Sequence, residues 1–305
     1  MPQNHVNRAP ILAVLGLVVT AAVMGGQFAV CKQGIGHGLT YQDIVALRVT
    51  FAALIGVPFC ILHGRALLHH HGIGRLAAMT LLSGAPYSLL FYYAISLAPT
   101  AHGSVIVPGS MALLGAVFGA YFFKETLGKV RICCLLALLA GLLLMSSAGL
   151  LHAGKNVLLG DALFFFVALS WAVYTIIFKR YGFTAMEAVS IIAAGSVLYL
   201  PVYFLVYTPN ITEWPLKQII LQGGYHGLLH GMLAMPLFAY GVRTLGAGSA
   251  SMSMALIPVF GLTIALTFMN ETPAALQWFG IALVIGAMLV NAGWSHYRKK
   301  RTLSL

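Results

Sequence analysis

Ten long apolar stretches constrain this sequence more than any other feature. A helix needs about 20 mostly apolar residues to cross the hydrocarbon core of a bilayer, and ten segments meet that requirement. Only 8% of the 305 residues are charged, whereas soluble domains carry about 25%, and the mean hydropathy is +0.92. We therefore predict an all-α integral membrane protein with ten transmembrane helices. The predicted spans are 10–31, 42–62, 74–97, 101–123, 130–150, 157–178, 185–207, 219–241, 247–269 and 275–294.

The basic residues are divided unevenly between the predicted loops. If both termini are cytoplasmic, thirteen of the 17 Lys and Arg residues fall on the inner side, and Lys32, Lys155 and Lys217 fall on the outer side. Cytoplasmic loops of membrane proteins carry such an excess of positive charge. The asymmetry predicts a multi-pass protein of a bacterial inner (plasma) membrane with both termini in the cytoplasm. It also accounts for the net charge of +11, so we expect no nucleic-acid partner.

The two halves of the chain are related by a constant offset of 146 residues. The identities in register are Ala101 with Ala247, Gly115 with Gly261, Phe122 with Phe268, and Glu125 with Glu271. Residues 10–150 and 157–294 are therefore predicted to be two related five-helix repeats. Because five is an odd number, the second repeat must be inverted in the membrane, and inverted repeats that rock about a central site recur in secondary transporters.

These motifs resemble the EamA domain of the drug/metabolite transporter superfamily. In that family the fourth helix of each half carries an Ala, a Pro and a Glu in this order, which the second half matches with Ala247, Pro258 and Glu271. The first half has Ala112 where the Pro belongs. The segment 25–28 resembles the Trp-Gly-x-x-Phe motif of the first helix without its Trp. The resemblance covers nearly the whole chain and implies a metabolite exporter or exchanger with a cavity lined mainly by spans 1, 3, 4, 6, 8 and 9.

Polar and aromatic residues in the spans are the candidates for substrate contact, because polar groups are costly in the bilayer and are kept for function. The candidates are Gln27, Phe28, Tyr87, Tyr92, Trp171, Tyr174, His226, His230, Tyr240 and Ser253. The set is largely neutral and aromatic, so it predicts hydrogen bonding and stacking with a small amphipathic substrate, with amino acids first. Phosphates and nucleotide sugars would require paired Lys or Arg side chains.

Three charged residues at the spans are predicted to be structural anchors. Glu125 and Glu271 end helices at the membrane surface, and Arg48 lies within the second span, five residues after Asp43. A local ion pair between Arg48 and Asp43 is one expectation, and contact of Arg48 with an anionic substrate group is the alternative. Asp161 is expected to act as a charge in the first turn of its helix, where acidic groups interact favourably with the helix dipole.

The histidines allow several interpretations. His226 and His230 are four residues apart on one face of a helix, which suits a structural pair, substrate contact or proton coupling. A zinc-binding helix would carry Glu between them, where this chain has Gly227, so we expect no metal. His63 and the run 69–71 are expected in a solvated loop between the second and third spans.

The motifs that the chain lacks narrow its function further. No P-loop, HExxH or GxSxG motif occurs in the sequence, which disfavours ATP hydrolysis and common hydrolase chemistry. We therefore expect no enzyme and no cofactor, but a secondary exporter that works by alternating access in the lipid bilayer. A multidrug exporter of the same fold and an intramembrane enzyme using His226 and His230 are the alternatives. The sequence leaves proton coupling and the oligomeric state open.

Overall fold

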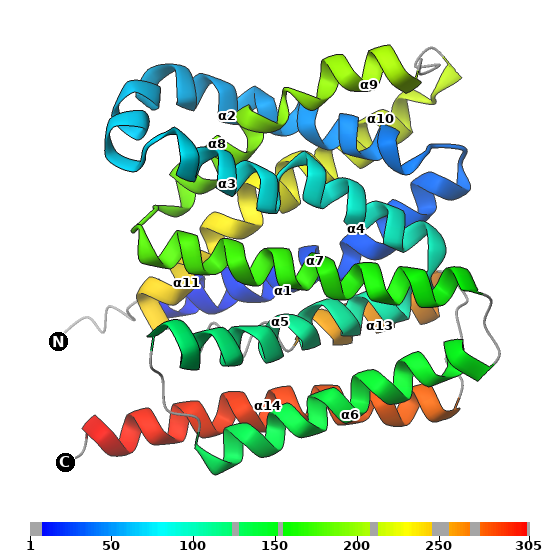
Figure 1. Cartoon of the computed structure of the whole chain (residues 1–305), viewed down its shortest axis with the longest axis vertical. Helices are drawn as coiled ribbons and strands as arrows, with labels where there is room; N and C mark the ends of the chain where they lie inside the picture. The colour runs from blue at the N-terminus through cyan, green and yellow to red at the C-terminus, as the bar shows by residue number, and fades with distance from the viewer. Residues whose placement is uncertain are drawn as a thin grey trace, which may run out of the picture.

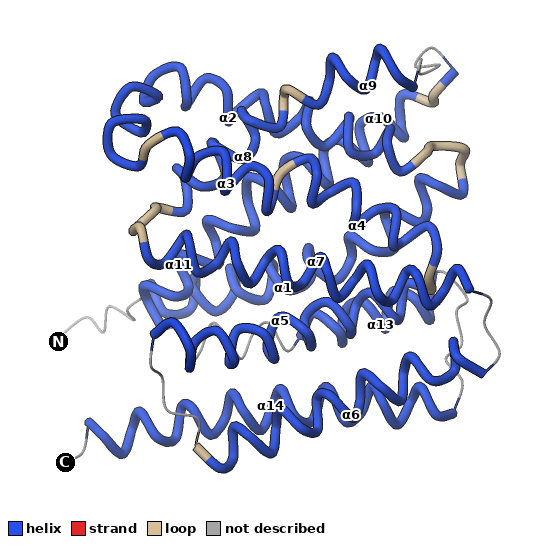
Figure 2. Tube along the Cα trace, in the orientation of Figure 1, coloured by secondary structure: helices blue, strands red, loops and turns tan. Residues whose placement is uncertain are grey.

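Helices make up nearly all of the chain that the structure describes (Figure 2). The computed structural model describes residues 8–123, 128–151, 155–207, 213–245, 256–268 and 275–303, and these contain no strand. The helices are α1 (Arg8–Gly36), α2 (Tyr41–His71), α3 (Ile73–Ser83), α4 (Ala85–Leu97), α5 (Thr100–Phe123), α6 (Lys129–Leu151), α7 (Lys155–Arg180), α8 (Ala185–Ser196), α9 (Tyr199–Tyr207), α10 (Leu216–Gln222), the π-helical segment η2 (Gly223–Ala234), α11 (Met235–Leu245), α13 (Leu256–Phe268) and α14 (Ala275–Leu303).

The helices form a layered bundle (Figure 1). At one end α6 and α14 pack closely against each other, and α5 and α13 lie between this pair and the rest of the molecule. At the other end α2 packs against η2 and α8. The start of α1 and the end of α14 lie on the same side of the bundle.

Six helical stretches among the described residues are long and apolar enough to cross a membrane. They are Ile11–Gly36, Tyr41–His71, Ile73–Leu97, His102–Phe122, Lys155–Arg180 and Ala185–Tyr207. Large apolar side chains also point outward, including Leu62, Leu205 and Phe279, whose exposed fractions are 79%, 82% and 71%. A soluble monomer rarely exposes so much apolar surface, so both observations agree with the predicted all-α membrane class. The other four predicted spans fall on α6, on α10 to α11, on α13 and on α14, and they stay predictions.

Two helices begin with matching capping boxes. The Thr40 hydroxyl accepts from the backbone N–H of Asp43 at the start of α2, and the Asp43 carboxylate accepts from the backbone N–H of Thr40. Thr184 and Glu187 repeat the arrangement at the start of α8. Each box satisfies two N–H groups that a helix start would leave without partners. Asp43 also accepts a hydrogen bond from the Tyr203 hydroxyl, so the expected ion pair with Arg48 is not formed.

A buried contact between a histidine and an aspartate joins the two predicted repeats. Nδ1 of His102 in α5 lies 3.0 Å from a carboxylate oxygen of Asp161 in α7, and both side chains are almost fully buried. Asp161 is the seventh residue of α7, which begins at Lys155. It therefore lies beyond the first turn, and the expectation of a first-turn charge was wrong, because a partner from another helix sets its role.

Replacing Asp161 with alanine is expected to lower the stability of the folded protein by about 3–5 kcal/mol, because it leaves a buried partner without its counterpart. The measurement is the thermal unfolding midpoint of the purified protein in detergent. Glu213→Ala is the matched control, since Glu213 is exposed. Equal midpoints for the two variants would show that the buried pair does not stabilise the fold.

Candidate functional site

A large cavity lies among the helices and brings together half of the predicted substrate-contact residues. It has a volume of about 360 Å³, and its wall includes Gln27, Phe28, Tyr87, Trp171 and His230. Gln27 and Tyr87 are more than nine-tenths buried. Pockets that bind small molecules have volumes of about 300–1,000 Å³ with mostly apolar walls and a few polar groups, so this large cavity suits a small amphipathic molecule.

The rest of its wall was not predicted. The further lining residues are Met24, Val107, Pro108, Met111, Gly115, Arg131, Leu138, Met235, Phe238, Ile257, Met288 and Asn291. The six spans expected to line the cavity all contribute to it, and α6 and α14 contribute in addition. The 146-residue offset relates Met111 to Ile257, so the repeat signal could have identified this pair. The methionines gave no sequence signal, because isolated methionines in apolar helices are ordinarily packing residues.

A small cavity of about 40 Å³ adjoins the large one. Trp171, His230 and Met235 line both cavities, while Arg48 and Tyr174 line only the small one. Trp171 therefore stands in the common wall, with its ring centroid 6.1 Å from that of Tyr87 and 5.0 Å from that of Tyr174. The two cavities share Trp171, His230 and Met235 in their walls and are therefore neighbouring parts of one candidate site.

A break in the third predicted span shapes the small cavity. The span is divided at Gly84 into α3 and α4, as the short loop between them shows in Figure 2. A Cβ atom at Gly84 would lie 2.5 Å from the Ser196 hydroxyl oxygen, so only glycine permits this approach. The Ser196 hydroxyl accepts from the backbone N–H of Ala85, the first residue of α4. Pro86, in the next position, has no N–H to lose, which suits a helix start.

Arg48, in the wall of the small cavity, is held by two predicted site residues. Its Nη1 donates to the Tyr92 hydroxyl over 3.2 Å and contacts Nδ1 of His230 at 3.4 Å. A guanidinium cannot accept a hydrogen bond, so Nδ1 of His230 accepts and the imidazole carries its proton on Nε2. His230 can therefore donate from Nε2.

His226 lies behind this cluster in η2. It is fully buried, and neither ring nitrogen has a hydrogen-bond partner among the described residues. Its ring centroid lies 4.9 Å from that of Tyr92. π-helical segments are rare and are frequently found at functional sites. No group of three His, Cys, Asp or Glu side chains suited to a metal ion occurs among the residues that were described.

The remaining predicted residues lie elsewhere. Tyr92 is fully buried behind Arg48, and Tyr240 on α11 is 40% exposed and lines neither cavity. Ser253, Glu125 and Glu271 fall outside the described residues.

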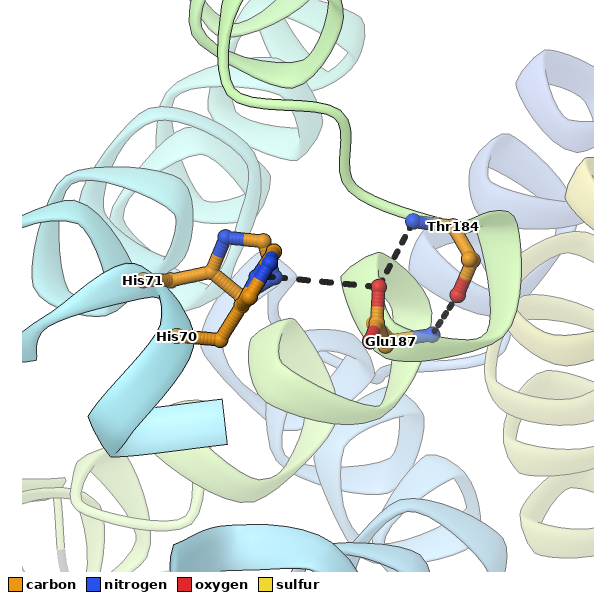
Figure 3. A network of polar contacts seen from close by, with 4 residues as sticks. All are labelled: His70, His71, Thr184 and Glu187. Carbon is orange, nitrogen blue, oxygen red and sulfur yellow. Dashed lines mark hydrogen bonds and ion pairs between the residues drawn. The ribbon is translucent and has the colours of Figure 1, made fainter. Parts of the chain in front are cut away.

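A separate polar network lies at the end of α2 (Figure 3). Nε2 of His71 lies 3.8 Å from the Glu187 carboxylate and 3.2 Å from Nδ1 of His70. The His71 ring stacks on Phe183 at a centroid distance of 3.8 Å. The histidines were expected in a solvated loop, but α2 continues to His71, and His71 is buried. That expectation was wrong for His71, because its acidic partner comes from α8, far away in the sequence, whereas His63, His69 and His70 are exposed.

Comparison with protein families and with individual proteins adds independent information. The sequence matches the model of the EamA-like transporter family twice, over residues 11–147 and 158–293. A WAT1-related chloroplastic protein of Arabidopsis thaliana is 26% identical over 267 residues, which cover 81% of this chain and 62% of that protein. The chain thus spans less than two thirds of the length of this relative.

Two bacterial relatives match over most of their length. The uncharacterised transporter YdfC of Bacillus subtilis is 23% identical over 283 residues, which cover 89% of each chain. A protein of Salmonella typhimurium named a probable amino-acid metabolite efflux pump is 24% identical over 314 residues, covering 93% of this chain and 95% of that one. A solved crystal structure has a similar fold, with a TM-score of 0.63, 19% identity, and coverage of 92% of this chain and 96% of the other.

Proposed function

The chain belongs to the EamA-like transporter family, and from that premise we propose that it exports small amphipathic metabolites, such as amino acids, by alternating access. The observation that carries the proposal is the large cavity, about 360 Å³ in volume, whose wall is built from both matched segments, 11–147 and 158–293. A cavity between two related halves can open to either side when the halves rock. The name of the Salmonella relative supports export and an amino-acid-like substrate.

The proposed topology has ten spans in two inverted five-helix halves, 10–150 and 157–294, in a bacterial inner membrane. The described start of α1 and end of α14 lie on one side of the bundle (Figure 1), as an even number of spans requires. The excess of basic residues in alternate loops supports a cytoplasmic position for both termini. Cysteine labelling tests this topology. Single cysteines are placed near residues 8 and 303 in a variant without native cysteines, and their labelling from each side of the spheroplast membrane is compared.

Counterflow in proteoliposomes tests the transport function. Liposomes loaded with unlabelled metabolites are diluted into labelled amino acids and related compounds, and the proposal expects uptake that protein-free liposomes do not show. A parallel arm with a pH gradient distinguishes proton coupling from exchange, for which His226 and His230 are the candidate groups. Absence of uptake across a broad amino-acid, organic-acid and drug panel would contradict the proposal.

A multidrug exporter of the same fold is the second candidate. The four methionines in the wall of the large cavity favour it, because flexible thioether side chains adapt to ligands of different shape. Uptake of several unrelated drugs with similar efficiency would support this candidate over a metabolite exporter. The family and the names of the relatives indicate a transporter rather than an enzyme.

A further inference from the structure

The small cavity offers hydrogen-bond donors and positive charge in a confined space. One buried water needs about 10–15 Å³ of such volume, so the cavity of about 40 Å³ is large enough for a group of two or three heavy atoms. Arg48 lines the small cavity. Of the nitrogen atoms of its guanidinium group, only Nη1 makes hydrogen bonds to described residues. The guanidinium has five N–H groups, so its remaining donors are available to a bound group.

Two buried hydroxyls add to the donors of Arg48, and a nearby helix start adds only its dipole, because the N–H groups of Gly84 and Ala85 are bonded to Thr80 and Ser196. The Ser83 side chain is 4% exposed and that of Tyr174 is 3% exposed, and both line the small cavity. Neither hydroxyl has a hydrogen-bond partner among the residues that the structure describes. Gly84 and Ala85, at the beginning of the 13-residue helix α4, belong to the same wall. The first N–H groups of a helix carry a partial positive charge that favours an anion.

Acidic groups are missing from both cavity walls as far as the structure describes them. None of the described lining residues is Asp or Glu. The acidic side chains in the described part of the chain are engaged or placed elsewhere: Asp43 with Tyr203, Asp161 with His102, Glu187 with His71, and Glu213 exposed near the start of α10. Among the described residues, an ammonium group in this site would therefore find no counter-charge, whereas a carboxylate would find Arg48.

The large cavity, whose lining includes Gln27, Arg131 and Asn291 among mostly apolar residues, provides room for an apolar body. Met24, Met111, Met235 and Met288 form much of its wall together with aromatic side chains. Thioethers interact favourably with aromatic rings and adapt to their shape. His230 and Trp171 lie where the two cavities meet, and Nε2 of His230 can donate to an oxygen at this junction.

We propose that the two cavities form one bipartite site for an apolar carboxylate, with the carboxylate in the small cavity against Arg48 and Ser83 and the apolar body in the large cavity. This inference rests on the proposed transport function and narrows its substrate class. Within the amphipathic compounds, acids without an amino group bind more tightly than amino acids, neutral amides or amines.

The test is a series of ligands that share one apolar body and differ in the polar group. Binding of 3-phenylpropionate, 3-phenylpropionamide, phenylalanine and 3-phenylpropylamine to the purified full chain in detergent is measured by calorimetry. The carboxylate is expected to bind at least about tenfold more tightly than the amide or the amine, because hydrogen bonds to charged groups are the stronger ones. Equal or tighter binding of the amide or the amine would overturn the inference.

Two variants locate the carboxylate. Arg48→Gln is expected to weaken binding of 3-phenylpropionate by at least about tenfold and to leave binding of the amide unchanged. Ser83→Ala, a smaller change in the same wall, is expected to weaken it by about fivefold. Arg65→Gln is the matched control, because Arg65 is an exposed residue of the same helix α2, and its affinities should equal those of the wild type. If Arg48→Gln does not fold, Ser83→Ala and the ligand series still decide the matter.

The two proposals fail in different ways. In one outcome, amines or amino acids show counterflow, but the binding measurements show no preference for 3-phenylpropionate. This result would overturn the carboxylate site and leave the transport function intact. Selective binding of 3-phenylpropionate that depends on Arg48, without counterflow of any compound, would support the carboxylate site and contradict transport.

Discussion

Replacing Trp171 with alanine is expected to weaken substrate binding by about 30-fold or more. Trp171 lines both cavities and contacts Tyr87 in the large one and Tyr174 in the small one. Truncation of a central aromatic residue in a binding site costs about 2 kcal/mol or more, which corresponds to about 30-fold in affinity. The measurement is the dissociation constant of the best substrate from the counterflow panel, together with its uptake rate in proteoliposomes.

Phe166→Ala provides the matched control for this change. Phe166 lies on the same helix α7, is also aromatic, and is 57% exposed on the outer surface. Removing the Phe166 ring takes away an apolar group on the outside of the bundle but leaves both cavities intact. Substrate affinity should therefore remain at the wild-type level. Similar losses of affinity in both variants would mean that the cavity wall at Trp171 is not where the substrate binds.

The helical class and much of the candidate site followed from local properties of the sequence. The length and composition of an apolar run depend only on residues adjacent in the sequence. These two properties predicted each of the six described stretches that can cross a membrane. Gln27, Phe28, Tyr87, Trp171 and His230 were identified as polar or aromatic residues within spans, and they line the large cavity. A polar group in an apolar helix is costly unless it serves a purpose, and the contact of these residues with substrate stays a prediction.

The contacts between distant helices could not be predicted in the same way. The partner of Asp43 is Tyr203, the partner of Asp161 is His102, and the partner of His71 is Glu187. These pairs depend on how α2, α5, α7, α8 and α9 pack, and no spacing along the chain encodes that. The contribution of α6 and α14 to the large cavity is likewise a consequence of packing.

The irregular helices can be inferred only in part from the sequence. Pro86 and Pro236 indicate bends, since proline removes a backbone donor, but the break at Gly84 depends on the close approach of Ser196 from another helix. The π-helical form of η2 had no signal in its residue types. Both irregular segments belong to the third predicted span of a repeat, and both contribute to the walls of the cavities.

Replacing Gly227 with alanine is expected to destabilise the fold by about 1–3 kcal/mol, the usual cost of adding a methyl group to a well-packed interior. Gly227 lies where η2 meets α2. A Cβ atom there would lie 2.8 Å from the backbone oxygen of Arg48 and 2.6 Å from the Cβ atom of Phe51. Because the backbone of α2 cannot move without Arg48, we also expect weaker substrate binding. Thermal unfolding in detergent and the dissociation constant of the substrate measure the two effects.

Gly231→Ala, one turn further along the same segment, is the matched control for the unfolding midpoint only, because Gly231 lines the small cavity. A Cβ atom at Gly231 would have its nearest neighbour at 3.4 Å, the backbone oxygen of His226, so the substitution fits without a shift of α2. The sequence presents the two glycines as an equivalent Gly-x-x-x-Gly pair, whereas the structure gives only the first a role in close packing. Equal unfolding midpoints for the two variants would contradict the close contact between η2 and α2, and with it the support that this contact gives to the position of Arg48.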